Sequence, residues 1–171
     1  MRTLVTYLSL TGNTRKVAEA IYGELPQPKE LKELGQVEDL SGYDLAFVGF
    51  PIHSSGQPDL GAVDFLRQKA AGRRVAIFVT HAATEDFPLM AEWMESCRQA
   101  ADGTKRVGIF HCQGALSEPQ LAVMRSSPDP KVRDWADRAV HSAGQPDASR
   151  LEKARTFTRE VLAGLETSSQ K

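Results

Sequence analysis

The sequence predicts an α/β fold, a three-layer, doubly wound structure in which helices cover both faces of a five-stranded parallel sheet. Short apolar runs rich in β-branched and aromatic residues alternate with segments of helical spacing, and this alternation is typical of parallel sheets. The chain has 171 residues, enough for one buried core and short for two, because domains commonly contain ~100–200 residues. We therefore expect a single domain over residues 1–171.

Four of the expected strands are nearly continuous apolar runs, as strands buried on both faces should be. They comprise residues 4–8, 45–50, 75–80 and 107–112. A weaker, half-exposed candidate lies at residues 31–34. Its lower apolar content suits a strand at the edge of the sheet.

Apolar residues that recur every three or four positions predict the helices between these strands. The stripes are Val17, Ile21 and Leu25; Leu60, Val63, Leu66 and Ala70; Phe87, Met90, Met94, Cys97 and Ala101; and Ala154, Phe157, Val161 and Leu165. The last stripe closes the domain with a helix, followed by a polar tail at residues 167–171.

A helical elaboration is expected at about residues 117–149, between the last strand and the last helix. One apolar stripe within it, which includes Val132 and Trp135, predicts a helix that begins near Asp129 and Pro130, because proline suits a first helical turn. The segment could serve as a lid or a partner surface. We favour the simpler interpretation that it covers an exposed edge of the sheet, since sheet edges generally need protection.

Composition and charge argue against several classes of protein. Hydrophobic residues make up 41% and charged residues 25% of the chain, which is ordinary for a globular protein and unlike a disordered or membrane-spanning one. A formal net charge of -1 provides no broad field for nucleic acid or anionic lipid, so we expect neither nucleic-acid nor membrane partners. The apolar part of the N-terminus is too short and too interrupted for a signal peptide, and we expect a cytoplasmic protein.

The most informative segment is the loop between the first strand and a helix expected to begin near Asn13. It reads Ser9, Leu10, Thr11, Gly12, Asn13 and Thr14. Backbone N–H groups at a helix start are unpaired and carry positive partial charge, hydroxyls add donors, and glycine lets a ligand approach closely. The loop therefore predicts a phosphate site, although the same residues could simply cap the helix and form a turn. We favour phosphate binding, because three hydroxyl residues in six positions exceed what capping needs.

The commoner nucleotide-binding loops are absent from the sequence. No GxxxxGKS/T or GxGxxG pattern follows an expected strand, which disfavours ATP and NAD on their usual loops. A mononucleotide held without a lysine fits the loop better.

The loop resembles the FMN-phosphate loop of the flavodoxins. The pattern S/T-x-T-G-x-T is matched by Ser9, Thr11, Gly12 and Thr14, and the resemblance covers roughly residues 2–112 and the final helix. It implies FMN as the cofactor, the strand order 2-1-3-4-5, and a site at the carboxyl ends of the strands where the strand order reverses. Two further loops, after the third and fourth strands, would frame the isoalloxazine ring.

On this resemblance, the FMN-binding residues fall into three loops. They are Ser9, Leu10, Thr11, Gly12, Asn13 and Thr14 at the phosphate, and Pro51, Ile52, His53, Ser54, Thr80, His81, Ala82, Ala83 and Phe87 around the ring. His53 and His81 could donate to the ring or offset the charge of reduced FMN. We expect no catalytic side chain, since the isoalloxazine would carry the redox chemistry.

Other chemistry-bearing residues have simpler interpretations. Cys97 and Cys112 lie far apart, without the spacing of a redox dithiol or a zinc site, and are expected to be free, structural thiols. Trp93 and Trp135 lie in helical segments outside the framing loops, so we interpret both as packing residues. Two loop histidines alone do not make a metal site.

Three functions remain open. The sequence slightly favours an electron-transfer protein that docks on a redox partner protein over an enzyme that takes hydride from NAD(P)H and reduces a quinone or a similar small acceptor. The third function is a binding module of the same fold without FMN. A monomer and a homodimer are both compatible with the sequence.

Overall fold

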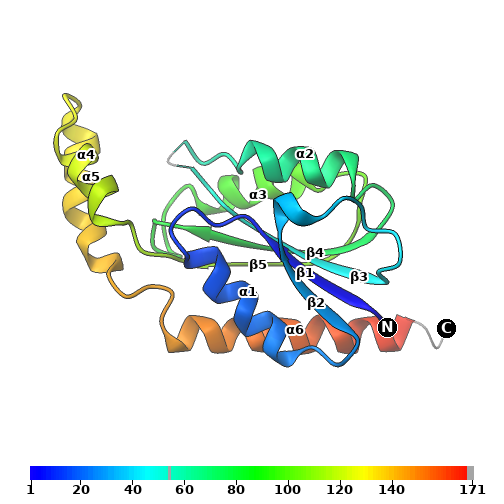
Figure 1. Ribbon diagram of the computed structural model, residues 1–171. Helices are drawn as coiled ribbons and strands as arrows, with labels where there is room; N and C mark the ends of the chain where they lie inside the picture. The colour runs from blue at the N-terminus through cyan, green and yellow to red at the C-terminus, as the bar shows by residue number, and fades with distance from the viewer. Residues whose placement is uncertain (54, 169–171) are drawn as a thin grey trace.

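A five-stranded sheet forms the middle layer of the protein, whose computed structural model describes residues 1–53 and 55–168 (Figure 1). The strands are β1 (Thr3–Tyr7), β2 (Lys29–Glu33), β3 (Leu45–Pro51), β4 (Arg74–His81) and β5 (Lys105–Gln113). Their order across the sheet is β2-β1-β3-β4-β5, and all the pairings between them are parallel. The predicted fold class and strand order are confirmed.

Burial explains why some strands are clearer in the sequence than others. β1, β3 and most of β4 are buried and largely apolar. β2 is half-buried at the sheet edge and reads Lys-Glu-Leu-Lys-Glu. It begins at Lys29, ahead of the predicted range. The prediction missed this start because the first residues of the strand are charged and do not match an apolar pattern.

Helices cover both faces of the sheet. α1 (Asn13–Glu24) and α6 (Ala148–Ser168) lie on one face, and α2 (Leu60–Gln68) and α3 (Met90–Ala100) lie on the other (Figure 1). Successive residues of a strand point to opposite faces. Phe47 and Phe78 accordingly join the core under α1 and α6, whereas Val48 and Val79 join the core under α2 and α3.

Three helical stripes differ in detail from the prediction. Leu60 is 77% exposed, because it is the first residue of α2 and the buried face of the helix begins two residues later, at Ala62. Phe87 precedes α3 and belongs to the loop after β4. α6 continues to Ser168, into the expected polar tail, because a helix that is already anchored needs no further apolar residues to extend.

α4 (Glu118–Arg125) and α5 (Pro130–Ala139) form a helical hairpin that stands off from the carboxyl end of the sheet (Figure 1). The hairpin has a small core of its own, in which Leu121 packs with Ala136 and Ala139. A short 3-10 turn, η2 (Val140–Ser142), follows it.

The two stems of the hairpin are hydrogen-bonded to each other. The N–H of Ala115 donates to the carbonyl of Gln145 (3.2 Å), and the N–H of Leu116 donates to Ser142 Oγ (3.3 Å). The chain therefore leaves the sheet and returns to it at one place.

The hairpin corrects two expectations. The sequence predicts one helix in residues 117–149, but the structure has α4 as well, which buries Leu121 alone and so shows no apolar stripe. The favoured interpretation as cover for a sheet edge is wrong, because the hairpin packs on itself and lies at the carboxyl end of the sheet (Figure 1). None of the described helices is long and apolar enough to cross a membrane.

Candidate functional site

The loop between β1 and α1 folds back onto its own serine. Gly12 has a φ of 88° and forms the N-cap of α1, a left-handed conformation that favours glycine. Ser9 Oγ accepts hydrogen bonds from the N–H groups of Gly12 (3.1 Å) and Arg15 (3.3 Å). The serine predicted to bind phosphate thus caps the helix from within the loop.

Other N–H groups near the start of α1 are available. Within the residues that the structure describes, the backbone N–H groups of Thr11, Asn13 and Thr14 have no acceptor. Such groups form the positive end of the helix dipole. The loop therefore offers donors to an anion.

The threonine hydroxyls of the loop have different tasks. Thr14 Oγ1 is buried against Thr80 Oγ1 (2.8 Å), which fixes the start of α1 to the end of β4. Thr11 Oγ1 accepts from the side-chain amide of Asn13 (3.0 Å), and its own O–H has no acceptor among the described residues. Thr11 is therefore the hydroxyl that is free to donate to a ligand.

Asn13 connects the first loop of the site to the last. Its Nδ2 donates to the carbonyl of Ala115 (2.7 Å). A Cβ atom at Gly114 would lie 2.7 Å from the same Nδ2. Gly114 thus lets the loop after β5 pass close to the start of α1.

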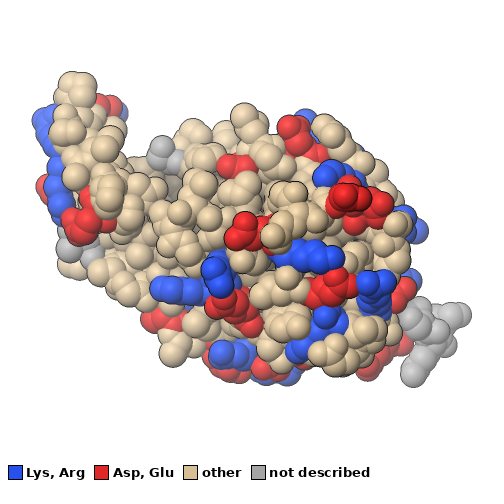
Figure 2. All heavy atoms as spheres, viewed as in Figure 1, with Lys and Arg blue, Asp and Glu red and all other residues tan. Residues whose placement is uncertain are grey.

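These loops and the α4–α5 hairpin border a cavity of about 480 Å³ at the carboxyl ends of the strands, within the ~300–1,000 Å³ typical of small-molecule sites. Ten of the predicted residues line it: Leu10, Thr11, Asn13, Thr14, Pro51, Ile52, His53, Thr80, His81 and Ala82. The remaining lining residues are Trp93, Gly114, Ala115, Leu116, Pro119, Gln120, Val123, Met124 and Trp135. No Asp, Glu, Lys or Arg is among these described residues. Figure 2 shows the same contrast, with uncharged surface between the hairpin and the sheet and charged side chains gathered over α1, β2 and α6.

Four predicted residues lie away from the cavity wall. Ser9 and Gly12 shape the loop from behind, and Ala83 is buried in the core under α2 and α3. The ring of Phe87 packs against Trp93, with 5.0 Å between the ring centroids. Ser54 lies outside the described residues.

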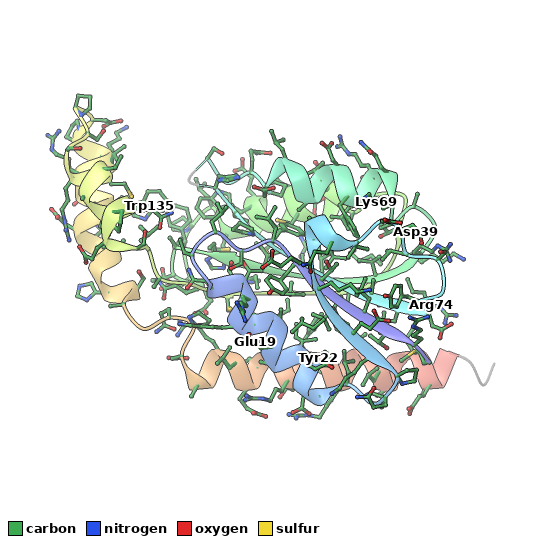
Figure 3. The ribbon with its side chains drawn as sticks, viewed as in Figure 1. Glu19, Tyr22, Asp39, Lys69, Arg74 and Trp135 are labelled. Carbon is green, nitrogen blue, oxygen red and sulfur yellow. The ribbon has the colours of Figure 1, made fainter. Side chains whose placement is uncertain are left out.

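Both tryptophans pack in the core under α2 and α3, as predicted, and both also line the cavity, which the sequence did not indicate. The loop after β3 lies directly on Trp93, since a Cβ atom at Gly56 would be 2.1 Å from its Nε1. Trp135 packs against the core from α5 and lies between the hairpin and the rest of the molecule (Figure 3). A topological signal could have indicated Trp135: an insertion that starts at the carboxyl end of β5 begins at the edge where parallel strands place their ligand sites.

His53 contributes to the start of α2. Its Nε2 lies 3.1 Å from Asp59 Oδ2, and Asp59 Oδ1 accepts from the N–H groups of Gly61 (2.8 Å) and Ala62 (3.3 Å). The aspartate therefore caps α2 and orients the histidine toward the cavity rim.

His81 is buried at the end of β4, with 3% of its surface exposed. Its Nδ1 lies 2.9 Å from the carbonyl oxygen of Ala83, and its Nε2 lies 2.9 Å from Nδ1 of His111 in β5. Burial lowers the pKa of His81 to about 4, and the neighbouring His111 adds to this effect. His81 is therefore a neutral imidazole at neutral pH.

An ion pair supports this part of the site from outside the cavity. Arg150, at the start of α6, donates two hydrogen bonds of 2.7 Å each to Glu85 in the loop after β4. Burial raises the pKa of Glu85, but hydrogen bonds from Arg150 and from the N–H of Gln113 outweigh it, so the pKa lies below its usual value. The pair ties the fourth-strand loop to the last helix.

The two cysteines are free and buried, as predicted. Burial raises the pKa of both Cys97 and Cys112 to about 12, so neither thiol ionises at neutral pH. Among the described residues, no group of three or more His, Cys, Asp and Glu side chains could hold a metal ion.

Fold and site together define a class of protein. A parallel sheet of order 2-1-3-4-5 with a cavity at its carboxyl edge, beside the reversal of strand order, is the arrangement of the flavodoxin-like nucleotide-binding folds. The profile of the flavodoxin domain family matches residues 4–159. The chain belongs to this family.

Particular relatives agree with this assignment. The flavodoxin-like domain-containing protein BilS of Clostridioides difficile strain CD3 is 28% identical over 172 residues, which cover 95% of this chain and 97% of the relative. A flavoprotein of Lactobacillus acidophilus NCFM, solved in complex with FMN, is 26% identical with a TM-score of 0.52 and covers 64% of this chain and 92% of its own. The flavodoxin of Streptococcus pneumoniae TIGR4 shares the fold, with a TM-score of 0.61 at 14% identity over 96% of this chain and 99% of its own.

Proposed function

We propose that the chain binds FMN in the carboxyl-end cavity and uses it for electron transfer. The observation that carries this proposal is that one cavity joins the unpaired N–H groups at the start of α1 to an apolar wall with Trp93 and Trp135. FMN has the complementary shape, with a phosphate dianion at one end and a flat conjugated ring at the other.

The phosphate would lie at the start of α1. The N–H groups of Thr11, Asn13 and Thr14 and the hydroxyl of Thr11 would donate to it, and the helix dipole favours a dianion there. Ser9 would hold the loop in shape, because its Oγ already accepts two hydrogen bonds from the loop. These donors fit a phosphate without a lysine.

The ring would lie against Ile52, Ala82 and Leu116, between the two tryptophans and the strand ends. Bound FMN supplies one- and two-electron redox chemistry. The chain would hold the ring, exclude water from it and set the energies of its oxidation states. No carboxylate among the described lining residues opposes negative charge on a reduced ring. The FMN complex of the Lactobacillus acidophilus flavoprotein supports this choice of cofactor.

An NAD(P)H-dependent reductase of a quinone or a similar small acceptor is the second candidate function. The hairpin favours it, because Val123 is 71% exposed and lines the cavity with Met124 and Trp135. Such an apolar wall beside the ring suits a small acceptor. Anaerobic addition of NADPH separates the two functions: a reductase bleaches the flavin absorbance within the mixing time, whereas a carrier stays oxidised until a reductase protein is added.

Fluorescence titration with FMN tests the proposed site. Thr11→Ala should weaken binding roughly 10- to 150-fold, since a hydrogen bond to a charged group contributes ~1.5–3 kcal/mol. Thr167→Ala is the matched control, because in the described part of the chain the Thr167 hydroxyl donates within α6, to Ala163 and Gly164, far from the cavity lining. Unchanged affinity of the Thr11 variant, or a wild-type protein that binds no FMN, would overturn the proposal.

A further inference from the structure

His81 and His111 form a pair of hydrogen-bonded imidazoles in the wall of the cavity. His81 lines the cavity, whereas His111 is half-buried behind it on β5. Nε2 of His81 and Nδ1 of His111 are 2.9 Å apart, and the rings are tilted by 40° with centroids 5.2 Å apart. The binding of FMN as proposed above makes no use of His111.

The partners of the pair determine which nitrogen carries each hydrogen. The Ala83 carbonyl can only accept, so Nδ1 of His81, 2.9 Å away, carries a hydrogen. Nε2 of a neutral His81 is then an acceptor, and Nδ1 of His111 must donate to it. Nε2 of His111 then carries the free lone pair of the pair of rings, and this nitrogen has no partner among the described residues.

Charged groups on three elements face the pair. Glu85, in the loop after β4, favours protonation of both histidines, whereas Arg98 on α3 opposes it at His111 and Arg150 on α6 opposes it at His81. Glu85 and Arg150 bind each other with two contacts of 2.7 Å, so their charges largely cancel. Burial, which lowers the pKa of both histidines, therefore decides the resting state, and the pair is neutral until negative charge is placed beside it.

We propose that this pair is a proton relay that carries one proton from water to His81, in the wall of the cavity. One proton binds at Nε2 of His111, the hydrogen on Nδ1 of His111 moves to Nε2 of His81, and His81 keeps its Nδ1 hydrogen on the Ala83 carbonyl. The pair gains one proton and one positive charge, and no electron moves within it. The charge arrives on His81, the ring that lines the cavity. This inference rests on the proposed function, because reduction of bound FMN by an external reductant is the source of the negative charge that draws the proton in.

The variant His111→Asn isolates the relay. The side-chain nitrogen of asparagine can occupy the place of Nδ1 and donate to His81, but it has no second nitrogen to bind a proton. His141→Asn is the matched control, because His141 is exposed and does not line the cavity. Neither residue is expected to contact FMN.

The measurement is the pH dependence of the two-electron midpoint potential of the FMN complex, by equilibration with a reference dye. Wild type and the His141 variant should bind about one more proton per flavin reduced than the His111 variant, a difference in slope of about 30 mV per pH unit for a two-electron couple. Equal slopes in all three proteins, with FMN bound, would overturn the relay alone. A wild-type protein that binds no FMN would overturn the proposed function, and the relay with it.

A second readout needs no cofactor. In the wild-type protein with ¹⁵N-labelled histidine, NMR should find the hydrogen on Nδ1 in both rings at neutral pH. A hydrogen on Nε2 of His81 would contradict the relay even if FMN binds normally.

Discussion

The substitution Gly114→Ala tests whether the first and last loops of the site must touch. A Cβ atom at residue 114 would lie 2.7 Å from Nδ2, 2.8 Å from Cγ and 2.9 Å from Cβ of Asn13. Rotation of the Asn13 side chain can relieve the first two contacts but not the third, because the backbone of α1 fixes the Cβ atom. We therefore expect the loop after β5 to move away and the 2.7 Å bond from Asn13 to Ala115 to break.

The magnitude follows from these contacts. Overpacking by one methyl group costs about 1–3 kcal/mol, and loss of the hydrogen bond adds about 0.5–1.5 kcal/mol. Alanine also restricts the unfolded chain, which returns about 0.4–1 kcal/mol. The free energy of unfolding should fall by about 0.5–4 kcal/mol. FMN affinity should fall with it, because the displaced loop borders the unpaired N–H groups.

Urea unfolding followed by tryptophan fluorescence measures the change. Gly23→Ala is the control: it lies within α1, nothing is within 4 Å of its Cβ position, and it should stabilise the protein by about 0.5–1 kcal/mol. In the double variant Asn13→Gly with Gly114→Ala, the added methyl group meets no side chain at residue 13. The double variant should therefore lose less stability than the sum of the two single losses. Wild-type stability of the alanine variant at 114, or strictly additive effects, would show that the two loops do not have to touch.

Three further predictions concern the surroundings of the cavity. The free energy of unfolding should fall by up to about 3 kcal/mol as pH drops from about 6.5 to about 4. Burial lowers the pKa of His81 to about 4, so across this range the unfolded chain binds a proton that the folded chain does not. Urea titrations at several pH values measure this fall, and it should be smaller in the variant His81→Asn. Arg150→Ala, which leaves the carboxylate of Glu85 without its partner, should lower the free energy of unfolding in a urea titration by about 1–2 kcal/mol. The control Arg138→Ala, at a side chain that is 76% exposed, should change it by less than about 0.5 kcal/mol. Trp135→Ala should weaken FMN binding roughly 3- to 10-fold, because the contact with the flavin ring is lost, and should leave the affinity for inorganic phosphate unchanged. Equal losses for both ligands in a competition titration would contradict the placement of the ring beside Trp135.

The fold was predictable because its buried strands carry their signal locally. In β3 and β4 apolar residues must fill both faces, so the run itself marks the strand. α4 carries no such signal, since it packs against two alanines of α5 and needs only Leu121 for the contact. The position of the hairpin at the carboxyl end, against the cavity, depends on long-range packing that no local pattern encodes.

The site was predictable in outline for a topological reason. Parallel strands bring their carboxyl ends to one edge, so loops far apart in the chain meet there. The sequence could not show which of two identical side chains has a free hydroxyl and which is already hydrogen-bonded within the fold. Thr11 and Thr14 match the same motif, yet one hydroxyl has no acceptor in the described part of the chain and the other is buried against Thr80, 66 residues away.

Two hydrogen bonds join the stems of the hairpin, from Ala115 to Gln145 and from Leu116 to Ser142. They make the segment between the stems a replaceable module. Because the chain departs and returns at a hydrogen-bonded neck, the length and composition of that segment can change without altering the register of any strand. The cavity wall that the hairpin provides can therefore be changed without altering the loop between β1 and α1. Grafting a different insertion between these stems would test whether the hairpin sets which acceptor or protein the proposed FMN site serves.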